Sequence, residues 1–260
     1  TTMNIAIAAW NATDGNTAVA YGWKAATTSG QWPSLALITE LSDSWPVKEG
    51  GFYKIGTDYY TAAGVKVDPI GTDFYIDGTD YYTAAGEKVE GFALADGTAT
   101  VSTANALLLW NAMAQTRHAL NLTLTADITL PQPAEGGSNW TPVGNSETPY
   151  TGTIDGGGHT LTGMVINTTG YNQGFVGYLD EGGKVQNLTF ANATVTSSGS
   201  NVGIVVGFNN GCTVENCHTT GTSSVEGFES VGGIVGSNSG LVSACINSSA
   251  VSATAQKDPW

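Results

Sequence analysis

The chain has few charged residues, and positive charge is especially scarce. Asp, Glu, Lys and Arg make up 12% of its 260 residues, whereas an ordinary globular domain has about 25%. The 8 Lys and Arg against 22 Asp and Glu give a formal net charge of −14. Such a chain repels the phosphates of nucleic acids and the surface of anionic membranes. We therefore expect no nucleic-acid partner.

Long apolar runs and an N-terminal leader are also missing. No stretch approaches the roughly 20 apolar residues that a membrane-spanning helix needs, so we expect no membrane insertion in this segment. Thr1 opens directly into polar sequence, without the charged and then apolar pattern of a signal peptide. We expect the sequence to be a mature product or, in preference, a fragment excised from a larger protein.

Cysteine is rare, with Cys212, Cys217 and Cys245 as its only three copies. These cysteines form no CxxC pair of the kind found in zinc sites and thioredoxin-like redox motifs. We interpret them as core thiols. A Cys212–Cys217 bridge across a short turn stays open as an alternative, because an exported protein can keep a disulfide.

Apolar and small residues are abundant, with 41% hydrophobic residues and 35 glycines. The polar surface must come mainly from Ser, Thr, Asn and Gly, which suit exposed strand faces and tight turns. This composition is typical of secreted β-proteins. We predict an all-β protein that is extracellular or lies on a bacterial cell surface.

A short aromatic repeat occupies the first half of the chain. The segment Gly56–Gly64 returns as Gly78–Gly86, with a partial copy at Gly71–Tyr75. The runs Phe52–Ile55 and Phe74–Ile76 favour strands, and Gly, Thr and Asp in the segments after them favour turns, so each unit reads as a small hairpin. We assign residues 46–97 to an aromatic β-hairpin repeat module.

A longer repeat of about 29 residues follows towards the C-terminus. Each unit has two strands joined by a turn. The first strands lie near Gly174, Ile204 and Ile234, and the second strands begin at Val185, Val214 and Val242. Leu188, Cys217 and Cys245 fall at one repeat position, which predicts an apolar ladder.

A period near 29 with short strands and corner glycines predicts a chain wound into stacked coils. We assign residues 98–260 to a parallel β-helix. A helix at about 102–117, with Ser102 as its N-cap, is expected to cover the open end of the first coil. After it, Leu122–Leu130 alternates apolar with polar residues and predicts the strand that starts the winding.

Four ordered blocks within about residues 98–260 resemble bacterial surface proteins that carry GLUG-type repeats. The blocks are Leu122–Ile128, Trp140–Gly144, Tyr150–Leu161 and Val231–Gly240. The resemblance implies a right-handed parallel β-helix on a large secreted or surface-attached protein, many of which are adhesin-like and some attached to IgA-cleaving metalloproteases. It implies no catalytic residues in the repeats. The protease context does not carry over, because this chain has no HExxH motif.

The N-terminal residues resemble the same proteins more loosely. Asn4–Asn11, Tyr21–Trp23 and Gly30–Pro33 look like the closing segment that follows the last coil in such proteins. We therefore interpret residues 1–45 as the closing segment of a preceding β-helix unit.

The sequence gives little support to catalysis. A pectin-type lyase needs a basic group, and Lys184, beside Asp180 and Glu181, is interpreted as part of a solvated turn. A glycosidase needs two carboxylates about 5 to 9.5 Å apart, and Glu215 has Gln186 at the matching position of a neighbouring coil. We predict that the chain is not an enzyme and holds no catalytic residues.

Metal and cofactor sites are not predicted either. The segment Asp155–His159 lacks the Lys-Ser/Thr of a phosphate-binding loop, so we interpret it as a tight corner in which Asp155 and His159 bond to the backbone. His118 and His218 lack partners at ligand spacing. Acidic residues gather in the hairpin turns without an EF-hand pattern, and calcium dependence stays open. These are Asp58, Asp73, Asp77 and Asp80.

The aromatic hairpin residues are the predicted ligand-binding site. Flat exposed rings beside Thr and Asp can stack on sugar rings, whereas the alternative is that these rings pack the hairpins together. The candidate residues are Tyr59, Tyr60, Phe74, Tyr75, Tyr81 and Tyr82.

These features together predict a non-enzymatic segment of a bacterial cell-surface or secreted adhesin. It would act as a rigid stalk, a binding surface, or both, for an extracellular glycan or a matrix or host protein. One alternative is a structural subunit that binds itself head to tail in a fibre. Another is a polysaccharide-active β-helix enzyme.

Overall fold

The computed structural model describes residues 4–5, 8, 21–24, 34–37 and 46–255. The chain divides into two compact units, Thr1–Val89 and Glu90–Trp260. The predicted closing segment at 1–45 lies largely outside the described residues. Within it, β1 (Tyr21–Lys24) pairs antiparallel with β2 (Ser34–Leu37).

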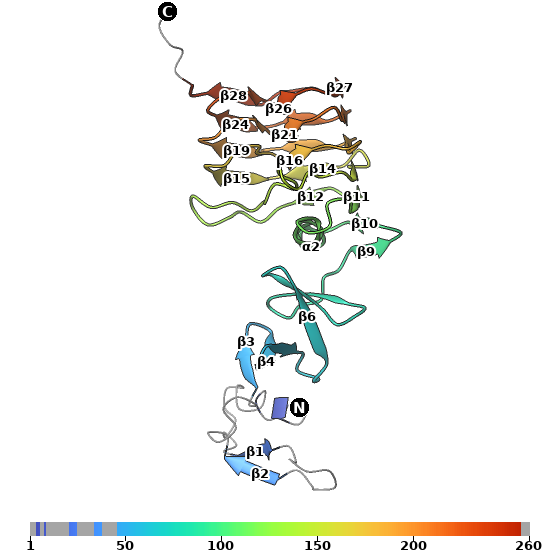
Figure 1. Ribbon diagram of the computed structural model, residues 1–260, viewed down its shortest axis with the longest axis vertical. Coiled ribbons are helices and arrows are strands. Elements are labelled where there is room, and N and C mark those ends of the chain that lie inside the picture. Colours follow the sequence, from blue (N-terminus) through green and yellow to red (C-terminus); the bar gives the residue numbers. More distant parts are fainter. Residues whose placement is uncertain (1–3, 6–7, 9–20, 25–33, 38–45, 256–260) are drawn as a thin grey trace, which may run out of the picture. The chain divides into compact units, whose positions relative to one another are not determined.

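The aromatic repeat folds into a six-stranded antiparallel sheet whose strands follow one another in chain order (Figure 1). The strands are β3 (Val47–Glu49), β4 (Phe52–Ile55), β5 (Asp58–Tyr60), β6 (Lys66–Ile70), β7 (Phe74–Ile76) and β8 (Tyr81–Thr83). Gly56 and Gly71 turn the chain between strands with φ of 61° and 63°, a conformation that costs glycine little. The predicted hairpins are confirmed.

The hairpin module is shorter than predicted at its C-terminal side. β9 (Phe92–Ala95) pairs antiparallel with β10 (Thr98–Val101), the strand that opens the second unit. Residues 90–97 therefore belong to the β-helix unit, because their backbone hydrogen bonds are made there.

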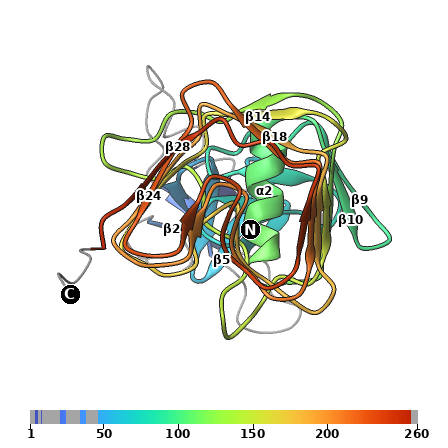
Figure 2. The same ribbon diagram turned by 90° about the horizontal axis from the view of Figure 1, so that it is seen from above.

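The second unit is a parallel β-helix, as predicted. Figure 2 looks along the stack and shows the strands of successive coils lying over one another. The largest sheet runs β10, β11 (Asn121–Leu124), β13 (Thr153–Asp155), β17 (Lys184–Gln186), β22 (Thr213–Glu215) and β27 (Leu241–Ser243), all parallel, with β9 at its first edge.

Two further sheets of four strands each close the coils. One holds β12 (Ile128–Thr129), β14 (Thr160–Thr162), β18 (Thr189–Ala191) and β23 (His218–Thr220). The other holds β15 (Val165–Thr168), β19 (Thr194–Ser197), β24 (Ser224–Gly227) and β28 (Ala250–Ala253). Smaller ladders join β16 (Val176–Leu179), β21 (Val206–Asn209) and β26 (Val235–Asn238), and β20 (Val202–Gly203) and β25 (Val231–Gly232).

The register of these sheets places chemically similar side chains over one another on successive coils. Ile154, Val185, Val214 and Val242 are successive partners in one column, and the first three are fully buried. Their chain neighbours face outward, because adjacent strand residues point to opposite faces. Apolar columns thus form one continuous core.

Asparagines occupy several corners of the coils where the sequence suggested glycine. Asn187 and Asn216 share a corner position with φ of 54° and 49°, and asparagine adopts this left-handed conformation more readily than most residues. Asn216 Nδ2 donates to Asn187 Oδ1 at 2.9 Å, and Asn187 Nδ2 donates to Asp155 Oδ1 at 3.0 Å. The side-chain amides therefore link coil to coil.

Helix α2 (Ala104–Ala114) covers the first coil, as predicted, but its bounds differ from 102–117. The N-cap is Thr103, whose Oγ1 accepts from Ala106 N at 3.2 Å. Ser102 was the wrong N-cap, because Thr103 is the extended residue (φ −134°, ψ 161°) directly before the first helical turn. No helix among the described residues is long and apolar enough to cross a membrane.

Trp110 anchors this helix to the coil below it. Its side chain is 0% exposed and stacks on Trp140 and Phe175, with ring centroids 6.3 and 6.2 Å away. Its Nε1 donates to Leu120 O at 3.3 Å. The first end of the core is therefore closed by aromatic packing.

Candidate binding surfaces

One face of the hairpin sheet carries an aromatic stack. Tyr75 lies between Phe52, at 4.4 Å between ring centroids, and Tyr59, at 5.1 Å. Tyr59 OH donates to Glu49 Oε1 at 3.2 Å, and Lys54 Nζ lies 5.1 Å from the Tyr59 ring centroid. Burial raises the pKa of Tyr75, with Tyr59 adding to the shift. These rings chiefly pack against one another.

The opposite face is covered by residues near the N-terminus. Tyr53 lies opposite Tyr60 in the β4–β5 ladder. Tyr53 forms a buried cluster with Ile5 and Ala8, and Tyr60 packs against that cluster. One face packs its rings against one another and the other packs on Ile5 and Ala8, so consecutive aromatic residues are each partly or fully buried.

Tyr82 is tied to a turn through its hydroxyl group. Tyr82 OH donates to Asp77 Oδ2 at 2.9 Å, and this hydrogen bond raises the pKa of Tyr82. Asp77 Oδ1 also accepts from the N–H groups of Asp80 and Thr79 at 2.8 and 3.1 Å. These backbone bonds lower the pKa of Asp77 to about 2.

The six predicted site residues thus do not gather on one open platform. Phe74 is only 6% exposed, so its ring belongs to the interior. Tyr81 is half-buried in β8, opposite Ile76. Tyr59, Tyr75 and Tyr82 keep partly exposed edges. Ligand binding by the hairpin module stays a prediction, and we limit its predicted site to the exposed edges of these three rings.

The acidic residues of the hairpin turns already have protein partners. Asp58 pairs with Lys66 Nζ at 3.1 Å, and Asp80 pairs with Lys88 Nζ at 2.9 Å. Asp73 accepts from Thr72 Oγ1 at 3.0 Å. Among the described residues, no three His, Cys, Asp or Glu side chains are grouped to hold a metal ion.

The outer faces of the β-helix carry columns of short polar side chains. Thr160, Thr189 and His218 are successive partners in the sheet of β14, β18 and β23. All three are half-buried and outward-facing, between inward residues such as Leu161 and Phe190. Two hydroxyl groups and one imidazole at regular spacing can make several weak hydrogen bonds to an extended ligand.

An outward aromatic pair was missed in the sequence. Tyr178 and Phe208 are partners on β16 and β21, and their rings stack at 4.8 Å with an interplanar angle of 18°. Ser237 continues the column. The repeat could have indicated this pair, because Tyr178 and Phe208 each directly follow a glycine at the same position of successive repeat units.

Two charged positions on the large sheet, Lys184 and the column of Glu215, differ from what the sequence predicted. Lys184 opens β17 and pairs with Glu215 Oε2 at 3.0 Å, so it is not part of a solvated turn. The column of Glu215 does contain a second acid, Asp155, two coils away with Gln186 between them. The comparison of Glu215 with its nearest coil did not include coils two apart, which share the same column.

Asp155 is nevertheless poorly suited to donate a proton. It accepts from Gly157 N, Gln186 Nε2 and Asn187 Nδ2 at 2.9, 2.8 and 3.0 Å. Burial alone would raise the pKa of Asp155, but these hydrogen bonds outweigh it and lower the pKa. A glycosidase general acid needs a raised pKa.

The histidines take structural positions. His159 Nδ1 lies 3.3 Å from Asp127 Oδ1, so its ring pairs with a carboxylate and not with the backbone as predicted. His218 Nδ1 accepts from Ile246 N at 3.2 Å, while its neighbour Cys217 faces the core. The two sides of the strand keep this imidazole and thiol apart.

The Cys212–Cys217 bridge, which was left open as an alternative to core thiols, does not form. Strand β22 lies between them, and its rise of about 3.3 Å per residue keeps their Cα atoms farther apart than the limit of about 7 Å for a disulfide. All three cysteines are free, and Cys212 and Cys217 are buried, as predicted for core thiols. Cys217 and Cys245 follow Leu188 in one ladder.

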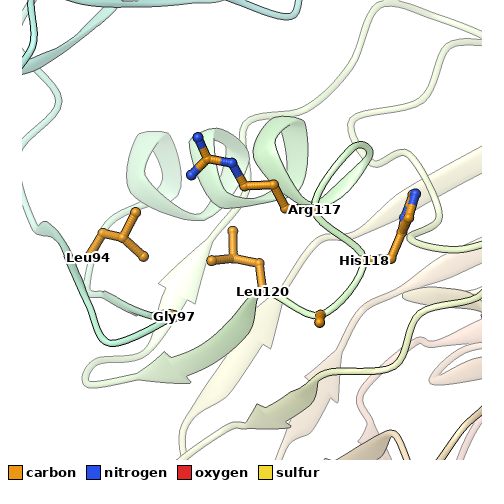
Figure 3. Close-up of a pocket in the computed structure, with 6 residues that line it drawn as sticks. Leu94, Gly97, Arg117, His118 and Leu120 are labelled. Atoms are coloured by element: carbon orange, nitrogen blue, oxygen red, sulfur yellow. The ribbon is translucent and has the colours of Figure 1, made fainter.

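An open hollow of about 490 Å³ lies beside the end of α2. Figure 3 shows Leu94 and Leu120 beneath the Arg117 side chain, with His118 set to one side. His118 Nδ1 is buried without a hydrogen-bond partner. The lining supplies one permanent cation but no carboxylate or thiol nucleophile.

Comparisons with known proteins support the fold more than any activity. No protein-family model matches the chain. A solved structure described as "a putative immunoglobulin A1 protease" from Bacteroides ovatus is 25% identical, with a TM-score of 0.50. The match covers 65% of this chain and 52% of that one.

Two curated proteins match a short part of the sequence. Halomucin from Haloquadratum walsbyi is 40% identical over 63 residues, which is 24% of this chain and 1% of Halomucin. A "Putative Gly-rich membrane protein" from Evansella cellulosilytica is 37% identical over 62 residues, 24% of this chain and 7% of that protein. The chain thus spans only a small part of the curated relatives it matches.

Proposed function

We propose that the chain is a non-catalytic segment of a bacterial cell-surface or secreted adhesin, in which the β-helix is both a stiff spacer and a binding surface. The in-register stacking of the coils carries this proposal. Each coil is joined to the next by backbone ladders, buried columns and asparagine side chains. A stack held at so many points resists bending.

The partner we propose is an extracellular glycan or an extended matrix or host protein. The Thr160, Thr189 and His218 column offers hydrogen-bonding groups at the spacing of the coils, about 4.8 Å. The partly exposed edges of Tyr59, Tyr75 and Tyr82 are a second, smaller contact area. The resemblance to GLUG-type surface proteins, and the names of the two curated relatives, favour a place outside the cell.

Catalysis is not part of this proposal. Asp155 is held in its ionised form, and Lys184 and Glu215 neutralise each other. The neighbour described as a putative protease shares a β-helix, and a fold alone does not carry an activity.

A binding screen tests the proposal. The purified chain is applied to a glycan array and to immobilised matrix proteins, with heat-denatured protein as control. We expect saturable binding to at least one ligand by the native chain alone. Binding to none would overturn the adhesin role. Release of new reducing ends from a polysaccharide panel would show an enzyme instead.

A further inference from the structure

Cys217 and Cys245 repeat each other's surroundings one coil apart. Cys217 Sγ lies 3.8 Å from Val185 O and 3.4 Å from Glu215 O. Cys245 Sγ lies 3.7 Å from Val214 O and 3.2 Å from Ser243 O. Both side chains therefore project from the same corner in the same direction.

The register brings these two thiols within bridging range. Glu215 and Ser243, two residues before the cysteines, are partners in the β22–β27 ladder. Neighbouring parallel strands lie about 4.8 Å apart, inside the range of about 4.4 to 6.8 Å for Cα atoms joined by a disulfide. Cys217 N also donates to Cys245 Sγ at 3.4 Å. A bridge needs a change of side-chain rotamer and a small approach of the two Cβ atoms, which lie about 3.5 to 4.5 Å apart in a disulfide.

The two thiols differ in access and acidity. Cys217 is buried, whereas Cys245, in the last described coil, is half-buried. The hydrogen bond from the Cys217 thiol lowers the pKa of Cys245 to about 6, although burial opposes the shift. The same contact, and then burial, raises the pKa of Cys217. Cys245 is thus the thiolate that an external reagent meets first.

We propose that Cys217 and Cys245 are a redox-active pair that closes into a disulfide and fastens the last coil to the one before it. The oxidant is a low-molecular-weight disulfide. Cys245 thiolate attacks one of its sulfurs and releases one thiolate, forming a mixed disulfide. Cys217 then gives its proton to the released thiolate, attacks Cys245 Sγ and releases the second thiolate. Two protein thiols are oxidised and one small disulfide is reduced to two thiols.

The test is oxidation of the reduced protein with glutathione disulfide, followed by alkylation and peptide mass spectrometry. We expect one linked pair of peptides containing Cys217 and Cys245, with only Cys212 alkylated. The midpoint of thermal unfolding should rise, and dithiothreitol should reverse the rise.

Matched variants identify the pair. C245S should abolish the linked peptides while keeping the circular dichroism spectrum, because serine is of similar size and the site is half-buried. C212S should leave the linkage unchanged. Three alkylated cysteines after oxidation, a stable glutathione adduct on Cys245 alone, or a bridge that includes Cys212 would each overturn the proposal.

Discussion

At the scale of single residues, the aromatic repeat shows which structural features a local sequence pattern can predict. The β-prone pairs and the Gly-Thr-Asp turns were sufficient to predict hairpins. They were not sufficient to show which rings are accessible, because residues distant in sequence pack on one face of the sheet. Ile5 and Ala8 pack beside Tyr53 and Tyr60, and no feature of the repeat itself indicates that contact.

The carboxylate of Asp77 should contribute to stability in a pH-dependent way. Its folded pKa of about 2 lies below the unfolded value, so its contribution is present above about pH 4 and is lost as the pH falls towards 2. Allowing for solvent screening, we expect D77N to lose about 1 kcal/mol at pH 7 and almost nothing at pH 2. Urea unfolding followed by near-ultraviolet circular dichroism measures both differences. D73N is the control, and an equal loss at both pH values would contradict the account.

Ala244 holds a corner conformation that suits it poorly. Its φ is 51°, at the position that Asn187 and Asn216 fill in earlier coils. Glycine adopts this conformation without the penalty of a Cβ atom. We expect A244G to raise the free energy of unfolding by about 0.5 to 1 kcal/mol.

The matched control for this substitution is A250G, placed in the extended strand β28. It should lower stability or leave it unchanged, as glycine does in a strand. If both substitutions changed stability in the same direction, the left-handed corner would not be the cause of the A244G effect.

At the scale of elements, the sequence correctly predicted a capping helix, but both ends of the helix differ from the predicted ends. Apolar residues after Ser102 and Thr103 indicated a helix, yet two adjacent hydroxyl residues can each serve as N-cap. Thr103 is held in the capping position by a long-range contact, because its Oγ1 also donates to Glu90 O. Such a tertiary contact cannot be read from local propensity.

Substitutions at these two positions distinguish the caps. Thr103 Oγ1 accepts from Ala106 N and donates to Glu90 O at 2.8 Å. We expect T103A to lower the free energy of unfolding by about 1 to 2 kcal/mol, and S102A by less than about 0.5 kcal/mol. Thermal unfolding of the two variants gives the comparison, and an equal loss would contradict the assignment of Thr103.

At the scale of the whole molecule, the coil period was the most informative feature of the sequence. Positions about 29 residues apart share a column, so the buried series of Val185 and Val214 followed directly from the repeat. The polar surface was harder to predict, because a column extends beyond immediate neighbours. Asp155, two coils from Glu215 in the same column, was missed for that reason.

The two ends of the β-helix differ, and this difference bears on the fibre alternative. Helix α2 and strand β9 cover the first coil, whereas Leu241 and Ile246 of the last described coil are 56% and 60% exposed. Head-to-tail growth needs an open edge at both ends. We therefore expect no filaments at rising concentration, and sedimentation of a species no larger than a dimer. Filaments in electron micrographs would contradict this account.

We propose that the partner contacts the polar column of β14, β18 and β23. The most direct test of this proposal is the affinity of T189R, relative to the unchanged chain, for the strongest ligand of the binding screen, measured by biolayer interferometry. S146R is the matched control, because it adds the same charge to an exposed turn outside the column. We expect at least about a tenfold loss of affinity for T189R, equivalent to about 1.4 kcal/mol, and no loss for S146R. Equal affinities of the two folded variants would contradict it.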